Sequence, residues 1–469
     1  MRQYQDMIIE ADNVKQVITP EKQVQRQFTV RVLSSPAGEM APDQAVLVSY
    51  DSTQLQDSLK KLDGRTLDRD GTIAFGTLLA TLLLPDQPDG DNSVYDLFVR
   101  SMDQIDQDGG LRLRLRLPEV LAKLPWEYMY VDRAESGGMD GFLALNPRVA
   151  IVRHEVMPRA STLEPASGTI KVVAALASPA ELPELNLAAE EADLHKALDR
   201  PGIEAAYLPQ ATLDEVLGKI SGASVFHFAG HGVFTTQQGE KLGTYTGSGA
   251  LALFDQTVDA ETLAVNLNGK GLRLAVLGGC ETGRREGNSV WSGLAPALIC
   301  SEAQVPAVVA NQFKIQDTCA IAFSKQFYTA LVGGLSIEEA VAVGRTAAYN
   351  EDEQGRDWGA PVLYLRPGDG QLFRGAADDA ARQQARAAAE VVSTIQVQHI
   401  ERGALVRGAE VGAIRKGRLT IAVSAATVAG TLIGGEFKVV EGGSIKADVN
   451  IGTVQDGGDV TGVKIDSLG

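Results

Sequence analysis

The sequence is poor in cysteine and has no long apolar run. Its 469 residues include only three cysteines, which cannot all pair within the chain and whose spacing resembles neither a metal clip nor a disulfide framework. The charged start lacks the apolar core of a signal peptide, and no run reaches the roughly 20 apolar residues that cross a bilayer. We therefore expect a cytoplasmic protein in a reducing compartment, with no metal, no cofactor and no membrane association.

Positive charge is also scarce. The chain has 60 acidic and 43 basic residues, which gives a net charge of -17. Such a field repels phosphate backbones and anionic membrane surfaces, so nucleic acid is not expected as a partner. A net charge of this size is typical of a soluble protein. The alternative interpretation is that the charge attracts a basic partner. With 44% hydrophobic residues and more length than one core usually organises, the chain is expected to fold into several domains.

The first third of the chain predicts an α+β N-terminal module, residues 1–168, which ends in a stretch rich in Pro, Ser and Thr. Short apolar runs indicate strands, and one segment alternates apolar and basic residues as a half-buried strand does. The expected strands are residues 28–33, 45–50 and the alternating 111–117, and the expected helices are residues 75–85 and 92–105.

A different sequence pattern follows over residues 169–370. Apolar runs alternate with segments of helical spacing, which predicts a mostly parallel sheet flanked by helices. The expected strands are residues 170–176, 203–208, 224–230, 250–254, 272–279, 307–311 and 360–366, and the expected helices are residues 188–200, 212–220, 319–334 and 336–350.

The remainder of the chain has another composition. Strong helix formers over residues 371–394 predict a connecting helix. Residues 395–469 alternate Val and Ile with frequent Gly, which predicts an all-β region of short strands and tight turns without a fixed repeat length. Strand edges in this region favour assembly or the sensing of a trigger, so we expect a regulatory or activating protein partner there.

Two residues are suited to nucleophilic catalysis. His231 follows the apolar run SVFHFAG, and Cys280 follows LRLAVLGG, 49 residues later, close to the spacing of about 50 known from caspases. The carboxyl ends of parallel strands meet at one edge of a sheet, so the imidazole can take the thiol proton. The neighbouring glycines permit close approach of a substrate, and the amides of Gly232 and Cys280 are the expected oxyanion donors.

The motifs HFAGHG and LGGCETG resemble the paired motifs of CHAT domains, relatives of caspases, separases and gingipains. The likeness covers about residues 70–370 and includes LPWEYMYVDR, GFLALNPRVAIVRHE and WGAPVLYLR. It implies a caspase-like sheet and a cysteine endopeptidase acting on a protein substrate, in a setting such as bacterial defence or programmed death. The tandem helical repeats that often precede CHAT domains are absent from the sequence, and the Gly-rich C-terminal region has no counterpart in the family core.

Several residues near the predicted dyad are candidates for substrate binding. We expect a basic substrate side chain to bind one of three carboxylates, those of Asp255, Asp259 and Glu281. The alternative interpretation is that all three are solvated surface carboxylates. Gln312 belongs to residues 307–313, which either pair with an extended substrate as an added strand or form a purely internal strand. Residues 283–293 are polar and follow the nucleophile, so we expect a mobile loop that is cut or ordered during activation.

Other reactive residue types have plainer interpretations. His227 either orients the base or is a satisfied core histidine. Cys300 and Cys319 lie in apolar helical runs and are expected to be buried, and Asp317 is expected to cap a helix. His154 and His195 are expected to have surface or structural roles.

Two other functions fit part of the pattern. A glutamine amidotransferase needs an H-x-E element after the cysteine, and only His399, in the Gly-rich region, matches. The other alternative is a catalytically silent scaffold that keeps the caspase-like shell and assembles partners. Loss of His231 or Cys280 would mark such a scaffold, but both are present.

Overall fold

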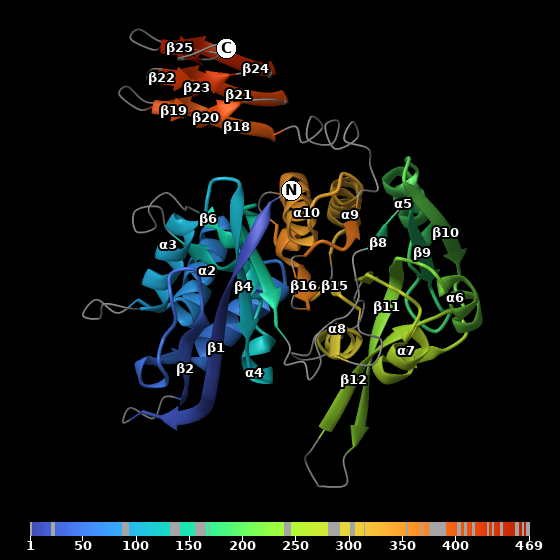
Figure 1. Cartoon of the computed structure of the whole chain (residues 1–469). Helices are drawn as coiled ribbons and strands as arrows, with labels where there is room; N and C mark the ends of the chain where they lie inside the picture. Colours follow the sequence, from blue (N-terminus) through green and yellow to red (C-terminus); the bar gives the residue numbers. More distant parts are fainter. Residues whose placement is uncertain are drawn as a thin grey trace. The chain divides into compact units, whose positions relative to one another are not determined.

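The computed structural model describes the chain except residues 1, 20–23, 87–92, 132–140, 155–165, 168, 239–244, 280–290, 301–304, 314, 353–354, 367, 369, 375–390, 401–404, 408–409, 415–417, 429–430, 434–435, 441–443, 455–458, 462–463 and 466–469. It divides into two compact units, Met1–Ala376 and Ala377–Gly469 (Figure 1). No helix in the described ranges combines the length and apolar character that a bilayer crossing requires.

The first unit is built on one sheet of 13 strands. Its main path runs β10-β9-β11-β14-β15-β16-β7-β4-β1-β2-β3, and β12 and β13 branch from β11. These strands are β1 Gln3–Ile18, β2 Val24–Ser34, β3 Val46–Asp51, β4 Gly109–Arg116, β7 Val149–Arg153, β9 Ile170–Ala177, β10 Ile203–Pro209, β11 Val225–Gln238, β12 Tyr245–Ala252, β13 Thr257–Asp259, β14 Leu274–Gly279, β15 Ala307–Asn311 and β16 Pro361–Leu365.

Helices cover both faces of this sheet. They are α1 Ser52–Asp63, α2 Arg69–Leu83, α3 Val94–Gln104, α4 Glu119–Ala122, α5 Leu187–Leu198, α6 Leu213–Ile220, α7 Ala260–Leu267, α8 Trp291–Cys300, α9 Asp317–Val332 and α10 Ile337–Glu351, and the short strand pairs are β5 Tyr130–Val131 with β6 Gly141–Phe142 and β8 Ala166–Ser167 with β17 Phe373–Arg374.

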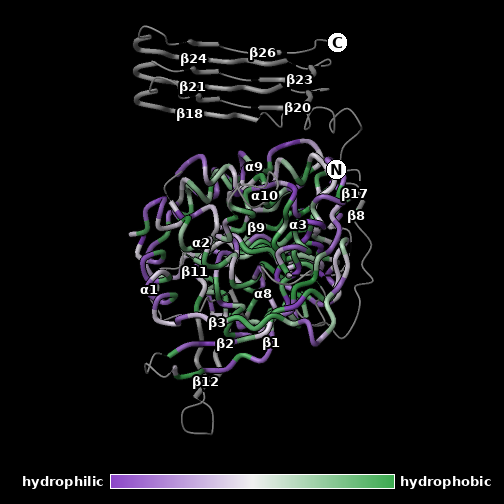
Figure 2. Tube along the Cα trace, turned by 90° about the vertical axis from the view of Figure 1, so that its left-hand side faces the viewer, coloured by the Kyte–Doolittle hydropathy of each residue, from purple (hydrophilic) through white to green (hydrophobic). Residues whose placement is uncertain are grey.

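Alternate residues of the central strands face different helices. Val225 and Ala229 of β11 belong to a core cluster with residues of α5, α9 and α10, whereas Phe226 and Phe228 belong to a second cluster with residues of α6, α7 and α8. Successive side chains of a strand point to opposite faces, so the apolar runs fill both layers. Figure 2 shows the hydrophobic segments of this unit gathered in its interior. The expected α/β class with a mostly parallel sheet between helices is confirmed.

The N-terminal strands and the strands after residue 169 join directly. β16 pairs in parallel with β7, and the larger core cluster contains residues from both parts. The position expected to end the N-terminal module, residue 168, therefore falls inside one compact unit. β1, a strand of 16 residues, was not expected from the sequence.

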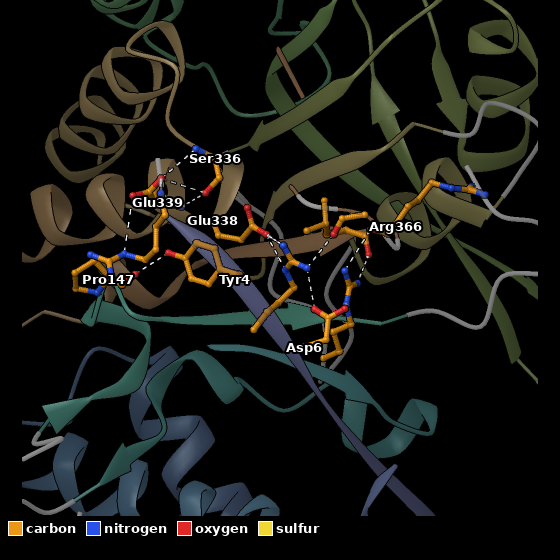
Figure 3. Close-up of polar contacts among 12 residues, drawn as sticks. Tyr4, Asp6, Pro147, Ser336, Glu338, Glu339 and Arg366 are labelled. Carbon is orange, nitrogen blue, oxygen red and sulfur yellow. Dashed lines mark hydrogen bonds and ion pairs between the residues drawn. The ribbon is translucent and has the colours of Figure 1, made fainter. Parts of the chain in front are cut away.

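The expectation that residues 111–117 form a half-buried strand is wrong. Arg112 and Arg114 of β4 are each 1% exposed, because β4 lies between β1 and β7 and is covered on both faces. Arg112 donates to Asp6 Oδ1 at 2.8 Å and, through Nε, to Glu338 Oε1 at 2.7 Å. Arg114 Nε lies 2.9 Å from Asp6 Oδ2. Two carboxylates thus balance two buried guanidinium groups (Figure 3).

The second unit is a stack of three coils, each made of three strands. They are β18 Val391–Ile400, β19 Leu405–Arg407 and β20 Glu410–Ile414 in the first coil, β21 Arg418–Val428, β22 Thr431–Ile433 and β23 Glu436–Val440 in the second, and β24 Ser444–Val454, β25 Asp459–Thr461 and β26 Lys464–Ile465 in the third. Equivalent strands of successive coils pair in parallel, which gives three sheets of three strands (Figure 1).

The coils of this stack repeat with two separations. Val391 is aligned with Leu419, 28 residues later, and Arg418 with Ser444, 26 residues later. The sequence-based expectation of an all-β region is confirmed for the described residues, and the two separations agree with the expectation that no single repeat length applies. β18 begins at Val391, inside the range expected to form the connecting helix, and most of that range, residues 375–390, lies outside the described part.

Candidate active site

The candidate site lies where two neighbouring parallel strands of the first unit end their pairing. β11 and β14 are aligned from Val225 and Leu274 to Gly230 and Gly279. The next residue of β11 is His231, and the residue after Gly279 is Cys280. Cys280 and Glu281 lie outside the described residues, so the position of the thiol is not described. The structure does bring together the two backbone positions that directly precede the predicted base and nucleophile.

His231 does not follow its strand, as the sequence predicted, but lies inside it. β11 continues to Gln238, and at His231 it exchanges β14 for β12, where Ala252 is the aligned residue. His231 is 2% exposed. Its Nε2 lies 2.7 Å from the carbonyl oxygen of Pro183, in the segment before α5.

This contact indicates the tautomer of the neutral ring. A carbonyl oxygen only accepts hydrogen bonds, so Nε2 must carry the proton and donate it. In the neutral imidazole the lone pair is then on Nδ1, which makes Nδ1 the basic nitrogen. Sequence reasoning missed Pro183, because a backbone carbonyl leaves no signature in residue type.

His227 is a buried histidine with its own partner. Its Nδ1 lies 2.7 Å from the hydroxyl oxygen of Tyr328 on α9. Burial lowers the pKa of His227 to about 4, so the ring is neutral near pH 7. Burial also raises the pKa of Tyr328. Of the two interpretations of His227, the structure favours the satisfied core histidine.

Gly230 is required by its neighbours. A Cβ atom at this position would lie 2.6 Å from the ring of Phe228 and 2.7 Å from the carbonyl oxygen of Ala177 on β9. The backbone beside His231 can therefore pack against β9 only with glycine. Gly232 is half-buried and is aligned with Leu251 of β12. Its amide as an oxyanion donor stays a prediction.

Gln312 follows β15 and is held by a polar network. Its Nε2 donates to Glu127 Oε2 and to the carbonyl oxygen of Gly359, both at 2.8 Å. Glu127 is buried and also accepts from Arg153 Nη2 at 2.7 Å. With both amide hydrogens occupied, the side chain presents Oε1 as its remaining polar group.

β15 itself is an internal strand. It pairs with β14 through Ala307–Ala310 and with β16 through Ala307–Asn311. Both edges of Ala307–Ala310 are occupied, so this part of residues 307–313 is an internal strand, as the second of the two interpretations has it.

The two described acidic candidates both bind backbone amides. Asp255 is exposed, and its Oδ1 accepts from the amide of Leu213, the first residue of α6, at 3.2 Å. Asp259 caps α7 by accepting from the amide of Thr262 at 2.8 Å. These bonds account for both residues without a substrate, although the exposed Asp255 stays available to solvent.

The two described cysteines and Asp317 lie in or at the start of helices. Cys319 is fully buried, and burial raises the pKa of its thiol to about 11, whereas Cys300 is only half-buried. Asp317 is the first residue of α9, directly after Gln316 at the N-cap position, and a capping role for its side chain stays a prediction. Among the residues that the structure describes, no group of three or more His, Cys, Asp or Glu is arranged to hold a metal ion.

The two other histidines of the first unit lie elsewhere in the fold. His195 on α5 stacks on Tyr207 of β10, with ring centroids 3.8 Å apart. His154 follows β7 and is half-buried, and burial together with Arg114 and Arg116 lowers its pKa. Neither lies at the end of the β11–β14 pairing, so the expected structural roles fit the structure.

Three solved structures are similar to this chain. The Arg-specific cysteine proteinase gingipain R shares 15% identity, with 62% of this chain and 70% of that chain covered and a TM-score of 0.41. The separase–securin complex of Saccharomyces cerevisiae shares 10% identity, with 77% and 30% covered and a TM-score of 0.39. The complex of the pro- and mature domains of RgpB from Porphyromonas gingivalis shares 12% identity, with 60% and 70% covered and a TM-score of 0.39.

Sequence comparison gives a more direct result. No curated protein matches the sequence significantly. The family model described as the CHAT domain matches residues 91–366. This range begins within the N-terminal strands and helices, contains both His231 and Cys280, and ends one residue after β16. Since the match covers more than half of the chain, this protein belongs to the CHAT domain family.

Proposed function

We propose that this protein is a cysteine endopeptidase in which His231 activates the thiol of Cys280. The observation that supports the proposal is the alignment of Gly230 with Gly279 on adjacent parallel strands. The carboxyl ends of adjacent parallel strands lie at the same edge of a sheet, where catalytic groups of α/β proteins gather. The bond from Nε2 to the Pro183 carbonyl assigns the proton of the neutral ring to Nε2 and the lone pair to Nδ1.

In the proposed reaction, Nδ1 of His231 accepts the thiol proton of Cys280, and the sulfur forms a bond to the carbonyl carbon of the scissile peptide. The electron pair of the carbonyl moves to its oxygen, which the amides of Gly232 and Cys280 stabilise. When the oxyanion collapses, the carbon–nitrogen bond breaks and the departing amine takes the proton from His231. Water then hydrolyses the thioester, which releases a carboxylic acid and restores the thiol.

Substrate contacts are proposed on both sides of this dyad. Gln312 Oε1 is suited to accept a hydrogen bond from a substrate amide, because its own amide nitrogen is held by Glu127 and Gly359. Asp255 or Glu281 is proposed to pair with a basic substrate side chain. Replacement of Gln312 by Glu would test the first of these contacts, because glutamate keeps an acceptor oxygen but cannot donate to Glu127 and Gly359.

Regulation is part of the proposal. We propose that the protein acts in the cytoplasm, that a protein partner controls it through the second unit, and that residues 283–293 are cut or ordered on activation. Most of that loop lies outside the described residues. The placement in bacterial defence or programmed death rests only on the resemblance to other CHAT proteins. Full activity of a purified enzyme whose loop is intact would remove the cleavage step.

The test uses a cysteine-reactive activity probe on the purified full chain. We expect labelling of the native protein, loss of labelling in Cys280→Ala, and no loss in the matched variant Cys300→Ala. Equal labelling of native protein and Cys280→Ala would contradict the peptidase and favour the silent scaffold. Mapping of new peptide termini in cells that express the native protein or Cys280→Ala would then identify substrates.

A further inference from the structure

Gln312 lies in the same row of the sheet as the glycines that precede the predicted base and nucleophile. The last aligned pair of β14 and β15 is Leu277 with Ala310. Two residues further along each segment are Gly279, the last residue of β14, and Gln312, the residue after β15. Gly279 is in turn aligned with Gly230 of β11. The carboxyl ends of parallel strands lie at one edge of a sheet, so Gln312 belongs to the edge where the candidate site lies.

The side-chain amide of Gln312 has one orientation that satisfies its partners. Its Nε2 donates to Glu127 Oε2 and to the carbonyl oxygen of Gly359, both at 2.8 Å. Both partners accept hydrogen bonds, so an amide turned by 180° would set its oxygen against two other oxygens. Oε1 has no hydrogen-bond partner among the described residues, and Gln312 is only half-buried. At this position the site therefore presents an acceptor and not a donor.

A buried ion pair holds this orientation in place. Glu127 is 0% exposed and Arg153 is 5% exposed. Arg153 donates from Nε to Glu127 Oε1 at 3.2 Å and from Nη2 to Oε2 at 2.7 Å. Two parallel bonds to one guanidinium group fix the plane of the carboxylate. Both residues come from the first third of the chain, Glu127 from the short helix η2 Trp126–Tyr128 and Arg153 from the end of β7.

We infer that Glu127 and Arg153 are positioning residues of the proposed active site, and that the group bound by Gln312 Oε1 is a main-chain N–H of an extended peptide substrate. The inference rests on the proposed function and names the substrate group that this position takes. Every residue of a peptide except proline carries such a donor, whereas side-chain donors occur only in some residues. A peptide that is N-methylated at this position has no hydrogen to donate and leaves Oε1 unpaired.

The test follows the labelling of Cys280 in the purified full chain by peptide mass spectrometry. The reagents are an acyloxymethyl ketone of the peptide Ala-Ala-Lys, from which the thiol displaces the acyloxy group, its analogues N-methylated at one amide each, and iodoacetamide. In the native protein we expect one N-methyl position to slow ketone labelling about tenfold, as loss of one hydrogen bond does. In Gln312→Leu the unmethylated ketone should react about tenfold more slowly, and the same N-methyl group should have no further effect. Iodoacetamide has no peptide part to position, so its rate should be equal in both proteins.

A double-mutant cycle separates the role of Glu127 from that of Gln312. Glu127→Gln keeps the size of the side chain and an oxygen for Arg153, but it places an amide nitrogen against Gln312. Ketone labelling should therefore slow as it does in Gln312→Leu, and the two substitutions together should slow it no more than one alone. The matched control is Gln316→Leu, an exposed glutamine at the start of α9, which should leave every rate unchanged.

The outcomes distinguish the inference from the proposed function. Thermal unfolding shows whether each variant is folded, and Glu127→Asp, which keeps the charge for Arg153 but withdraws the oxygen from Gln312, replaces Glu127→Gln if that variant is not. Independent effects in the cycle, or an N-methyl effect that persists in Gln312→Leu, would overturn the inference. Labelling of Cys280 that no N-methyl group slows would overturn it and leave the peptidase standing. No labelling of Cys280 by any reagent would contradict the peptidase and the inference with it.

Discussion

The buried charge cluster of the first unit makes a quantitative prediction about stability. Glu338 is 2% exposed and is the partner of Arg112, which is 1% exposed. Replacement of Glu338 by Gln leaves Arg112 and Arg114 with Asp6 as the only carboxylate of the cluster. Removal of one partner from a buried pair costs about 3–5 kcal/mol, because the remaining charge is not compensated.

The neighbouring residue supplies a matched control. Glu339 also lies in the first turn of α10, but its side chain is 13% exposed and its Oε2 accepts from the backbone of Arg2 and Ser336. Gln keeps an acceptor oxygen, so Glu339→Gln should cost less than about 1 kcal/mol. The free energy of unfolding can be followed in urea by the fluorescence of Trp126 and Trp358, which are buried in this unit. Equal stability of the two variants would refute the reasoning.

Three further outcomes are expected. The lowered pKa of His227 means that the unfolded chain binds a proton below about pH 6.5 and the folded chain only below about pH 4. Stability therefore falls as pH decreases through this window, by about 3 kcal/mol, and His227→Gln should lose that part of the slope in urea titrations at several pH values. Gly230→Ala should cost about 1–3 kcal/mol and reduce probe labelling, because its Cβ meets Phe228 and Ala177; unchanged labelling and stability would contradict the packing. Gln312→Glu places a carboxylate beside Glu127 and should raise KM more than it lowers kcat; an unchanged KM would remove Gln312 from the substrate site.

The strands of the central sheet could be predicted because their residues are apolar on both faces. β9, β14 and β15 consist mainly of Val, Ile, Leu and Ala, and each was predicted within a few residues. β1 was missed because polar and charged residues interrupt QYQDMIIEADNVKQVI, and only pairing with β2 and β4 makes it a strand. The part of β11 beyond His231 was missed because its hairpin with β12 is polar.

The buried charges and the site contacts depend on residues that are distant in sequence. Arg112 meets Asp6 and Glu338 across separations of 106 and 226 residues, so local alternation indicated a half-buried strand. The carbonyl of Pro183 reaches His231 across 48 residues and has no side-chain signature. The sequence could locate His231 by its motif and its apolar strand, but not the tautomer of its ring.

The repeat of the second unit illustrates another limit. Aligned residues of successive coils are separated by 26 positions in one step and by 28 in the other, and this holds along each sheet. A search for one period fails on such a pattern, although the strands themselves follow from alternating Val and Ile.

The central claim is that the imidazole of His231 activates the thiol of Cys280, and the pH dependence of alkylation tests it most directly. The full chain is treated briefly with iodoacetamide at a series of pH values, and the labelled cysteines are quantified by peptide mass spectrometry. We expect Cys280 to react at pH values well below those at which an ordinary thiol ionises, and His231→Gln to remove this reactivity while Cys300 is unaffected. A pH profile of Cys280 that is ordinary and identical in the native protein and His231→Gln would contradict the account.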